Sequence, residues 1–354
     1  MNIRLHASAG GGALKLAPGL RRRVIAAPAR GWIASLRQRQ DWPSQPRARL
    51  REAAKYLARA LCLPLLHTSY LRFVQGHARL RACCRRDPRL LERHLHRFVN
   101  DQWSRRERLR ALLAHYRFVL ATLPAPLFDA IYVEGGVPLG TLALKDGSEL
   151  VLSLRPSIDK GCEGELGIHL EEVGGRTLYR IVCTVIDDGR TLAIGCLQGP
   201  GGDDARELVR DLTKQMHGLR PKQLMLALAC AFARHAGIAR VVGIANRAHP
   251  LHRRRAGKFQ ADYDAFWTEQ HGVDEAAGGW FVLPAEPARK SEAEVPSHHR
   301  AAFRRREALR SAAEGVLTAA LGRSAPQREV AVQAAPRTVA PFMPFLPQEP
   351  AWIP

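Results

Sequence analysis

Hydrophobic residues follow two different spacings along this chain of 354 residues. From Arg47 to Ile131 they recur every three or four positions, which predicts a helical region. Its best-marked helix is expected to begin at Ser104, because Ser104 and Glu107 have the spacing of a capping box, and to end near Pro124. We therefore expect this part of the chain to fold as helices.

From Thr141 onward the spacing becomes two, which indicates β-strands. Short runs in which apolar and polar residues alternate are separated by turn-forming residues, and the strongest turn signal lies at Asp187 to Arg190. These runs predict an antiparallel meander.

Helical patterns return after the meander. A helix opened by Asp203 and Asp204 is followed by a second helix between Pro221 and Gly237, and then by an apolar strand at residues 239–245. We expect the fold class to be α+β, with a basic helical N-terminal region followed by an antiparallel or mixed β-sheet domain with packed helices. The expected parts are a disordered basic leader (1–46), a helical basic region (47–131), an α+β domain (132–310) and an Ala/Pro-rich, largely disordered tail (311–354).

The chain carries 54 Lys and Arg against 33 Asp and Glu, a formal charge of +21, and most of this excess lies at one end. Residues 1–46 carry +7 and residues 47–110 carry +12, whereas residues 111–283 carry −1 and residues 284–354 carry +3. A strongly basic block therefore precedes a nearly neutral remainder. Most of these basic positions are expected to form a solvated surface, and an anionic partner is the alternative.

Nucleic acid and the anionic surface of a membrane both fit a basic block. The sequence has no helix-turn-helix, zinc-finger or RNA-recognition motif, so we expect no specific nucleic-acid partner. Its longest apolar run, Leu224–Ala233, has ten residues and is too short to span a bilayer. With neither a transmembrane helix nor a signal peptide visible in the sequence, a cytoplasmic location is expected.

Cysteine and histidine spacings do not indicate a metal centre. The seven cysteines form no CxxC pair, and His249 and His252 have no carboxylate or cysteine at ligand spacing. Cys183, Cys196 and Cys230 lie inside apolar runs, where small buried residues are expected. We expect neither a disulfide framework nor a metal site.

The central and C-terminal parts contain a series of distinctive runs. They are RLRALLAHYRFV ending at Val119, GELGIHLEE from Gly164, IGCLQGP from Ile194, TKQMHGLRPKQLMLAL from Thr213, GIANRAHP from Gly243, ADYDAFW from Ala261, GGWFVLP from Gly278 and VPSHHRAAFRRREAL from Val295. In this order, over about residues 90–310, they resemble the VirK/YbjX family of bacterial proteins, the domain of unknown function DUF535.

The resemblance implies a cellular context and no catalytic residues. It implies support of envelope integrity, surface display of a virulence factor, or resistance to cationic antimicrobial peptides. The expected anionic partner then becomes the inner membrane surface or an envelope component, bound by a cytoplasmic protein that is peripheral to the inner membrane.

A second resemblance concerns the fold. The order of meander, helices, a strand followed by Asn246, and a later strand is similar to the N-acetyltransferase (GNAT) fold. It implies an alternative to a binding function, namely an acyltransferase that uses acyl-coenzyme A on an envelope component or an amine. In GNAT enzymes the amides at a helix N-terminus hold the pyrophosphate of coenzyme A, as the helix dipole favours.

Two segments are candidates for holding that pyrophosphate. The loop that contains Gln198, Gly199 and Gly201 is rich in glycine, but two aspartates follow it. Arg220 and Lys222 suit an anion better by charge, although the proline between them has no amide hydrogen. An ordinary helix cap is the alternative for both segments.

Acyl transfer also requires a base and a proton donor near the strand ends. Glu165 on the meander is the candidate base and Tyr263 the candidate acid. The remaining binding candidates are Asn246, His249, Lys258, Asp262, Asp264 and Trp267. The alternative for the segment around Tyr263 is a docked helix whose aromatic side chains pack inward while its acidic residues cap the N-terminus.

Overall fold

The helices of the N-terminal part begin and end at the residues that the sequence marks. The side chain of Ser104 accepts a hydrogen bond from the Glu107 amide, and the Glu107 carboxylate accepts one from the Ser104 amide, so the predicted capping box is confirmed. The helix that it opens ends two residues before Pro124. The helical elements before the sheet are α2 (Pro46–Leu61), α3 (Pro64–Gly76), α4 (Ala78–Arg86), the 3-10 helix η1 (Pro88–Leu95), α5 (Arg105–Thr122), α6 (Ala125–Asp129) and the π-helical turn η2 (Ala130–Glu134).

The computed structural model describes residues 31–37, 39–156, 162–251, 262–289 and 291–322. Its folded part begins before the expected end of the leader at residue 46, because residues 31–37 are helical and Trp42 is buried. Trp42 packs with Tyr56 of α2 and with Leu95 in a small hydrophobic cluster. The folded part also runs past residue 311, since α10 (Arg300–Leu321) is a continuous helix.

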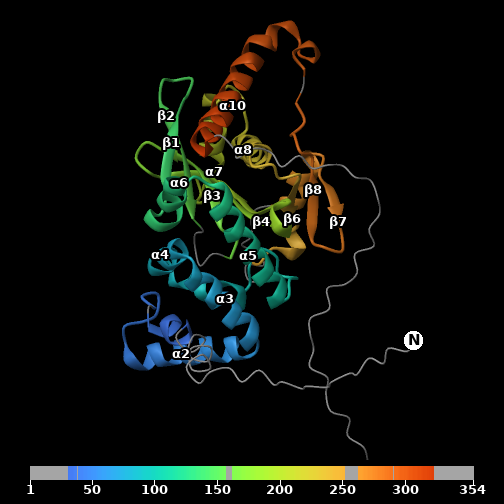
Figure 1. The fold of residues 1–354 in the computed structure, drawn as a ribbon. Coiled ribbons are helices and arrows are strands. Elements are labelled where there is room, and N and C mark those ends of the chain that lie inside the picture. Colours follow the sequence, from blue (N-terminus) through green and yellow to red (C-terminus); the bar gives the residue numbers. More distant parts are fainter. Residues whose placement is uncertain (1–30, 38, 157–161, 252–261, 290, 323–354) are drawn as a thin grey trace, which may run out of the picture. The chain divides into compact units, whose positions relative to one another are not determined.

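Eight strands in the described part of the chain form one sheet, in the order β1-β2-β3-β4-β5-β6-β8-β7 (Figure 1). They are β1 (Val137–Ala143), β2 (Glu149–Pro156), β3 (Leu166–Glu172), β4 (Thr177–Ile186), β5 (Thr191–Gln198), β6 (Arg240–Ile244), β7 (Val273–Glu275) and β8 (Trp280–Leu283). All neighbouring strands are antiparallel except β5 and β6, which run parallel. The predicted α+β class and the predicted hairpin between β4 and β5 are confirmed.

Two helices connect the parallel strands. α7 (Ala205–Gln215) and α8 (Pro221–His235) follow β5 and lead into β6, and α9 (Tyr263–Glu269) follows β6. Residues all around α8 are buried, because α8 contacts β3, β4, β5 and β6 on one side and α10 on another. In Figure 1, α8 and α10 lie toward the top of the view, whereas α2, α3 and α4 lie toward the bottom.

The parallel strands separate before they end. Their pairing runs from Thr191 opposite Arg240 to Ile194 opposite Gly243. β5 continues as far as Gln198, while β6 pairs with β8 on its other side. Four residues at the carboxyl end of β5 therefore extend beyond the paired part. This is the place in an open sheet where loops leave room for a ligand.

Candidate functional site

A cavity of about 520 Å³ lies at the carboxyl end of β5, within the usual range for ligand pockets. It is lined by the last residues of β5, the following loop, α7, the start of α8 and Tyr263 of α9. We call it the β5–α8 cavity. Six residues that the sequence marked as candidates line it, namely Gln198, Gly199, Gly201, Arg220, Lys222 and Tyr263.

The loop and the helix start that the sequence marks as two alternative phosphate sites border the same cavity. Arg220 is the N-cap residue of α8, and no side chain caps this helix end. The amides of Gln223 and Leu224 are hydrogen-bonded to the Arg220 carbonyl. The positive end of the dipole of a 15-residue helix therefore faces a space bordered by a glycine-containing loop.

Three cationic side chains stand around the cavity: Arg206, Arg220 and Lys222. Arg220 pairs with Glu269 of α9, and the Lys222 ammonium lies 5.6 Å from the centre of the Phe266 ring. Partial burial, together with the charge of Arg220, lowers the pKa of Lys222. A bound anion would relieve the repulsion between these two cations, so the charges suit an anionic ligand.

The inner wall of the cavity contains Tyr263. Its hydroxyl accepts a hydrogen bond from the Leu197 amide at 3.1 Å, so the tyrosine bonds to β5 where β6 no longer does. Burial raises the pKa of Tyr263 well above its ordinary value, which keeps the hydroxyl protonated. The His249 ring stacks against the Tyr263 ring with centroids 5.3 Å apart.

Glu163, which the sequence reasoning missed, lies beside this tyrosine and lines the cavity. Its Oε1 is 3.5 Å from Nε2 of His249. The Leu251 amide donates to Nδ1 of His249, so Nε2 carries a hydrogen and faces Glu163. Burial alone would raise the pKa of Glu163, but His249 and Arg180 outweigh it and the pKa is lowered. The carboxylate is therefore ionised at neutral pH.

The polar residues at the start of α9 are used in capping. Asp262 accepts from the Ala265 amide and from the side chain of Asn246, whereas Asp264 accepts from the Asn246 amide. The Tyr263 amide in turn donates to the side chain of Asn246. This arrangement matches the docked-helix alternative, with acidic residues at the helix start and buried aromatic side chains. None of these three polar side chains lines the β5–α8 cavity.

The last two candidates are Trp267 and Lys258. Trp267 is fully buried, and its indole Nε1 donates to the Ile244 carbonyl at 2.9 Å. It fastens α9 to β6 and does not line the cavity. Lys258 lies outside the described residues.

Glu165, the base expected from the sequence, is in a different place. Its carboxylate accepts hydrogen bonds from Arg93 of η1 and from the Tyr116 hydroxyl of α5, and it does not line the β5–α8 cavity. Burial raises the pKa of Glu165, and Arg93 and Tyr116 only partly oppose this rise. The structure thus assigns Glu165 to a buried cluster at the helical region.

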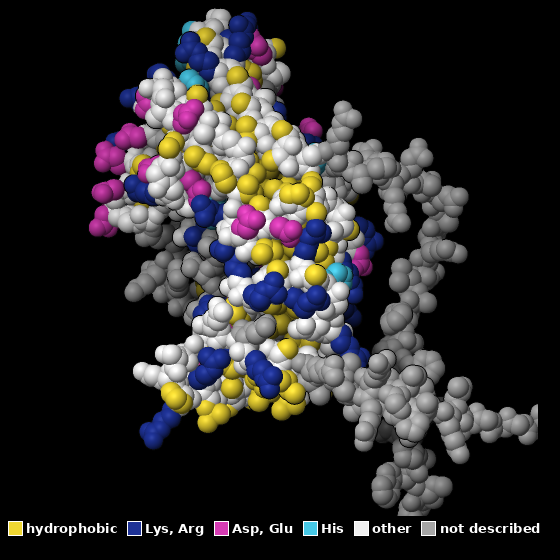
Figure 2. Space-filling model, turned by 60° about the vertical axis from the view of Figure 1, so that its left-hand side comes forward, with side chains coloured by type: hydrophobic (Ala, Val, Ile, Leu, Met, Phe, Trp, Pro, Cys, Tyr) yellow, Lys and Arg dark blue, Asp and Glu magenta, His cyan; other side chains and the backbone are white. Residues whose placement is uncertain are grey.

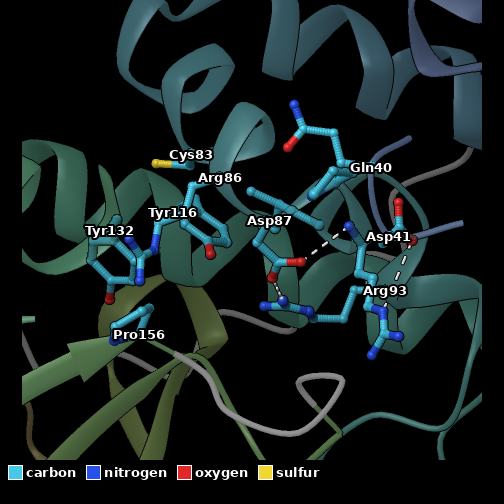
Figure 3. A pocket seen from close by; sticks show the side chains of 12 residues that line it. Gln40, Asp41, Cys83, Arg86, Asp87, Arg93, Tyr116, Tyr132 and Pro156 are labelled. Carbon is cyan, nitrogen blue, oxygen red and sulfur yellow. Dashed lines mark hydrogen bonds and ion pairs between the residues drawn. The ribbon is translucent and has the colours of Figure 1, made fainter. Parts of the chain in front are cut away.

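A second cavity, of about 560 Å³, lies beside this cluster (Figure 3). Figure 3 shows Arg93 and Asp87 facing one another, with Tyr116 and Tyr132 on the other side. The buried charges beside this cavity are paired, since Arg93 bridges Asp87 and Glu165. This pairing fits a structural role, in which the cluster holds the helical region to the sheet, better than it fits a ligand site.

Neither a metal centre nor a membrane span is visible in the described ranges. No group of three or more His, Cys, Asp or Glu side chains there is arranged to hold a metal ion. Among the same residues, every helix is too short or too polar to cross a bilayer.

Comparison with known proteins assigns the family. The family model described as "Protein of unknown function (DUF535)" matches residues 46–317. The chain belongs to this family. The uncharacterized protein YbjX of Escherichia coli is 33% identical over 259 residues, which cover 71% of this chain and 78% of YbjX.

Other relatives carry little functional information. An uncharacterized protein of Haemophilus influenzae is 28% identical over 59% of this chain and 69% of its own length. A protein of Mannheimia haemolytica named membrane protein LapB is 29% identical over 42% of this chain and 63% of its own length. No solved structure matches the chain. The DUF535 relatives therefore give the family, and a function has to be argued from the site.

Proposed function

We propose that the chain is an acyltransferase that binds acyl-coenzyme A in the β5–α8 cavity. The observation that carries this proposal is the separation of the parallel strands β5 and β6 beside that cavity. The sheet has one parallel pair, β5 and β6, and β8 lies between β6 and β7. This strand order is similar to that of the GNAT fold. In that fold the gap between the two parallel strands receives the pantetheine arm.

The charged side of the cavity supports the binding of the pyrophosphate. Arg220 and Lys222 flank the uncapped N-terminus of α8, and Arg206 stands across from them on α7. The amides of Gln223 and Leu224 bond to the Arg220 carbonyl, so the proposed anion site rests mainly on the cationic side chains and on the helix dipole. The loop that contains Gly199 and Gly201 also lines the β5–α8 cavity, where glycines leave the main chain accessible.

The inner wall supports the chemistry of acyl transfer. An acyl thioester supplies the acyl group; when an amine takes it, an N–C bond forms, the C–S bond breaks, the amine loses a proton and the thiol gains one. Glu163, ionised and next to His249, is placed to accept the proton. Tyr263, protonated and on the same wall, is placed to supply one.

The acceptor is proposed from the family resemblance, as an envelope component or an amine. A role in envelope integrity, virulence-factor display or resistance to cationic antimicrobial peptides is compatible with an enzyme that modifies such a component. The Mannheimia relative is named a membrane protein, which agrees with this setting. We propose that the chain works from the cytoplasm at the inner membrane surface.

Calorimetry with acetyl- and longer acyl-coenzyme A tests the proposal. The wild-type chain is expected to bind, and Arg220→Ala/Lys222→Ala to bind at least about tenfold more weakly, because two charge-assisted contacts are lost. The matched control is Arg176→Ala/Arg210→Ala, which removes two exposed, ion-paired arginines outside the cavity. Absence of binding by the wild type, or equal loss in the control, contradicts the coenzyme A site.

A purely binding function at the membrane was the other expectation from the sequence. It has support of its own in a surface at the opposite, N-terminal end of the described chain. That surface is independent of the cavity.

A further inference from the structure

A stripe of apolar side chains runs along the outer side of α2. Leu50, Ala54, Ala58 and Leu61 follow each other at intervals of four, four and three residues, and all four are exposed. This spacing places them on one face of the helix. The exposed fraction is 71% for Leu50 and 63% for Leu61. We call these four residues the α2 outer stripe.

The outer stripe is additional to the face of α2 that packs inward. Tyr56 and Ala60 are fully buried in the cluster around Trp42, with Ala53 and Leu57 packed against it. α2 is therefore apolar on two sides. Only the inner side has a partner within the described chain, so the outer side remains in contact with water.

Two further apolar side chains close in sequence to α2 are exposed. Leu65, in the first turn of α3, is 84% exposed, and Ile33 is 47% exposed. Six large hydrophobic side chains are exposed in the described ranges, and four of them lie between residues 33 and 65. Scattered single residues of this kind need no explanation, but such a concentration in one short segment does.

Basic side chains flank the stripe. Arg47, Arg51 and Lys55 are exposed on α2, whose single acidic residue, Glu52, is already paired with Lys55. Figure 2 shows hydrophobic side chains gathered at the lower end, where Figure 1 places α2, with Lys and Arg side chains beside them. An apolar strip with cations along one of its edges is similar in composition to helices that lie in a membrane interface.

We propose that α2 and the first turn of α3 form a docking face for an anionic lipid surface, with the outer stripe and Leu65 entering the headgroup region. Charge complementarity favours lipid over a protein partner, because the N-terminal 110 residues carry +19 and the surface presents cations around leucines. None of these residues lines the β5–α8 cavity. A variant of the docking face can therefore lose vesicle binding and keep acyl-coenzyme A binding, and a variant of the cavity can do the reverse.

Vesicle sedimentation of the full chain measures the apolar contribution. The vesicles are equimolar phosphatidylglycerol and phosphatidylcholine, and Leu61→Ser/Leu65→Ser is compared with Val173→Ser/Val273→Ser. The control valines are 70% and 69% exposed but lie outside the N-terminal helices. The leucine variant is expected to bind at least about tenfold more weakly, since two leucine side chains that would enter the headgroup region are lost. The valine variant is expected to bind like wild type.

The same assay measures the charge contribution. Arg47→Gln/Arg51→Gln is expected to bind about tenfold or more weakly, because each cation near an anionic surface contributes about a fivefold factor. Arg176→Gln/Arg210→Gln, with the same change of charge elsewhere, is expected to bind like wild type. Vesicles of phosphatidylcholine alone are expected to remove the difference between the two variants.

Two results would overturn the proposal. One is that the wild type does not bind the vesicles, or that the leucine and valine variants lose binding equally. The other is a dimer seen by analytical ultracentrifugation that Leu61→Ser/Leu65→Ser converts to monomer without changing vesicle binding, which would assign the face to a second copy of the chain. Circular dichroism and urea unfolding of each variant exclude loss of the fold as the cause. If the affinity for acyl-coenzyme A measured by calorimetry is unchanged in a variant, its effect is confined to docking.

Discussion

The guanidinium of Arg93 donates a hydrogen bond to the carboxylate of Glu165, and both side chains are buried. Arg93 belongs to η1, whereas Glu165 directly precedes β3, so this ion pair joins the helical region to the sheet across 72 residues of sequence. Asp87 and the Tyr116 hydroxyl complete the cluster. A buried pair of this kind contributes little net stability but is costly to break on one side only.

Arg93→Met is therefore expected to lower the free energy of unfolding by about 3–5 kcal/mol, because it leaves the two carboxylates of Asp87 and Glu165 without their shared cation. Urea unfolding measures this change. Arg79→Met is the control, since it removes a half-exposed ion pair with Asp129 and should cost less than about 1 kcal/mol. Equal effects of the two variants would show that Arg93 does not hold the helical region to the sheet.

Stability is expected to fall as the pH drops from about 6.5 to about 4. Burial lowers the pKa of His67 and of His169 to about 4, and that of His115 to about 3. In this window the unfolded chain binds protons at histidines that the folded chain keeps neutral. Each histidine therefore removes up to about 1.4 kcal/mol per pH unit. Urea midpoints at pH 7.5, 6 and 5 measure the loss.

His115→Gln supplies the test of this assignment. Nδ1 of His115 accepts from the Val185 amide, so the neutral ring carries its proton on Nε2 and donates it to the Tyr132 hydroxyl at 2.9 Å. The variant should reduce the slope of stability against pH between about pH 6.5 and 4, although it lowers stability at pH 7.5. A slope equal to that of wild type would mean that another group causes the acid sensitivity.

The local elements could be predicted because their signals are local. The capping box of Ser104 and the turn at Asp187 are each specified by four consecutive residues, and both occur where expected. The candidates Gln198, Arg220 and Tyr263 come from separate segments, yet they share one cavity because β5, α8 and α9 meet at the end of the parallel pair. The sequence marked Gln198 and Arg220 as anion-binding candidates and Tyr263 as a candidate proton donor, but only the fold places them together.

The sequence alone could not show which carboxylate lines the β5–α8 cavity. Glu163 and Glu165 are two residues apart on the approach to β3, and nothing local tells which one lines the cavity. The positions of the two carboxylates depend on partners far along the chain, since Arg93 forms an ion pair with Glu165 and His249 lies beside Glu163.

Gly195 is expected to be intolerant of a side chain. An added Cβ would lie 2.0 Å from the Glu163 carbonyl oxygen, which is main chain and cannot move like a flexible side chain. Gly195→Ala should therefore destabilise the fold by about 1–3 kcal/mol and displace Glu163. Gly201→Ala, with nothing within 4 Å of the new Cβ, should leave unfolding nearly unchanged. Similar urea midpoints for the two variants would contradict the close approach at β5.

Tyr263→Phe separates a structural role of this tyrosine from a role as proton donor. Loss of the hydroxyl leaves the Leu197 amide without its acceptor, so unfolding should become easier by about 1–3 kcal/mol. If the hydroxyl also supplies a proton, thiol release from acyl-coenzyme A with amine acceptors should fall by about 10²–10⁴, while calorimetric affinity changes little. Tyr179→Phe, which alters another tyrosine of the same cavity, is the control and should keep its rate. A variant that loses stability but turns over acyl-coenzyme A at the wild-type rate would restrict Tyr263 to holding α9 against β5.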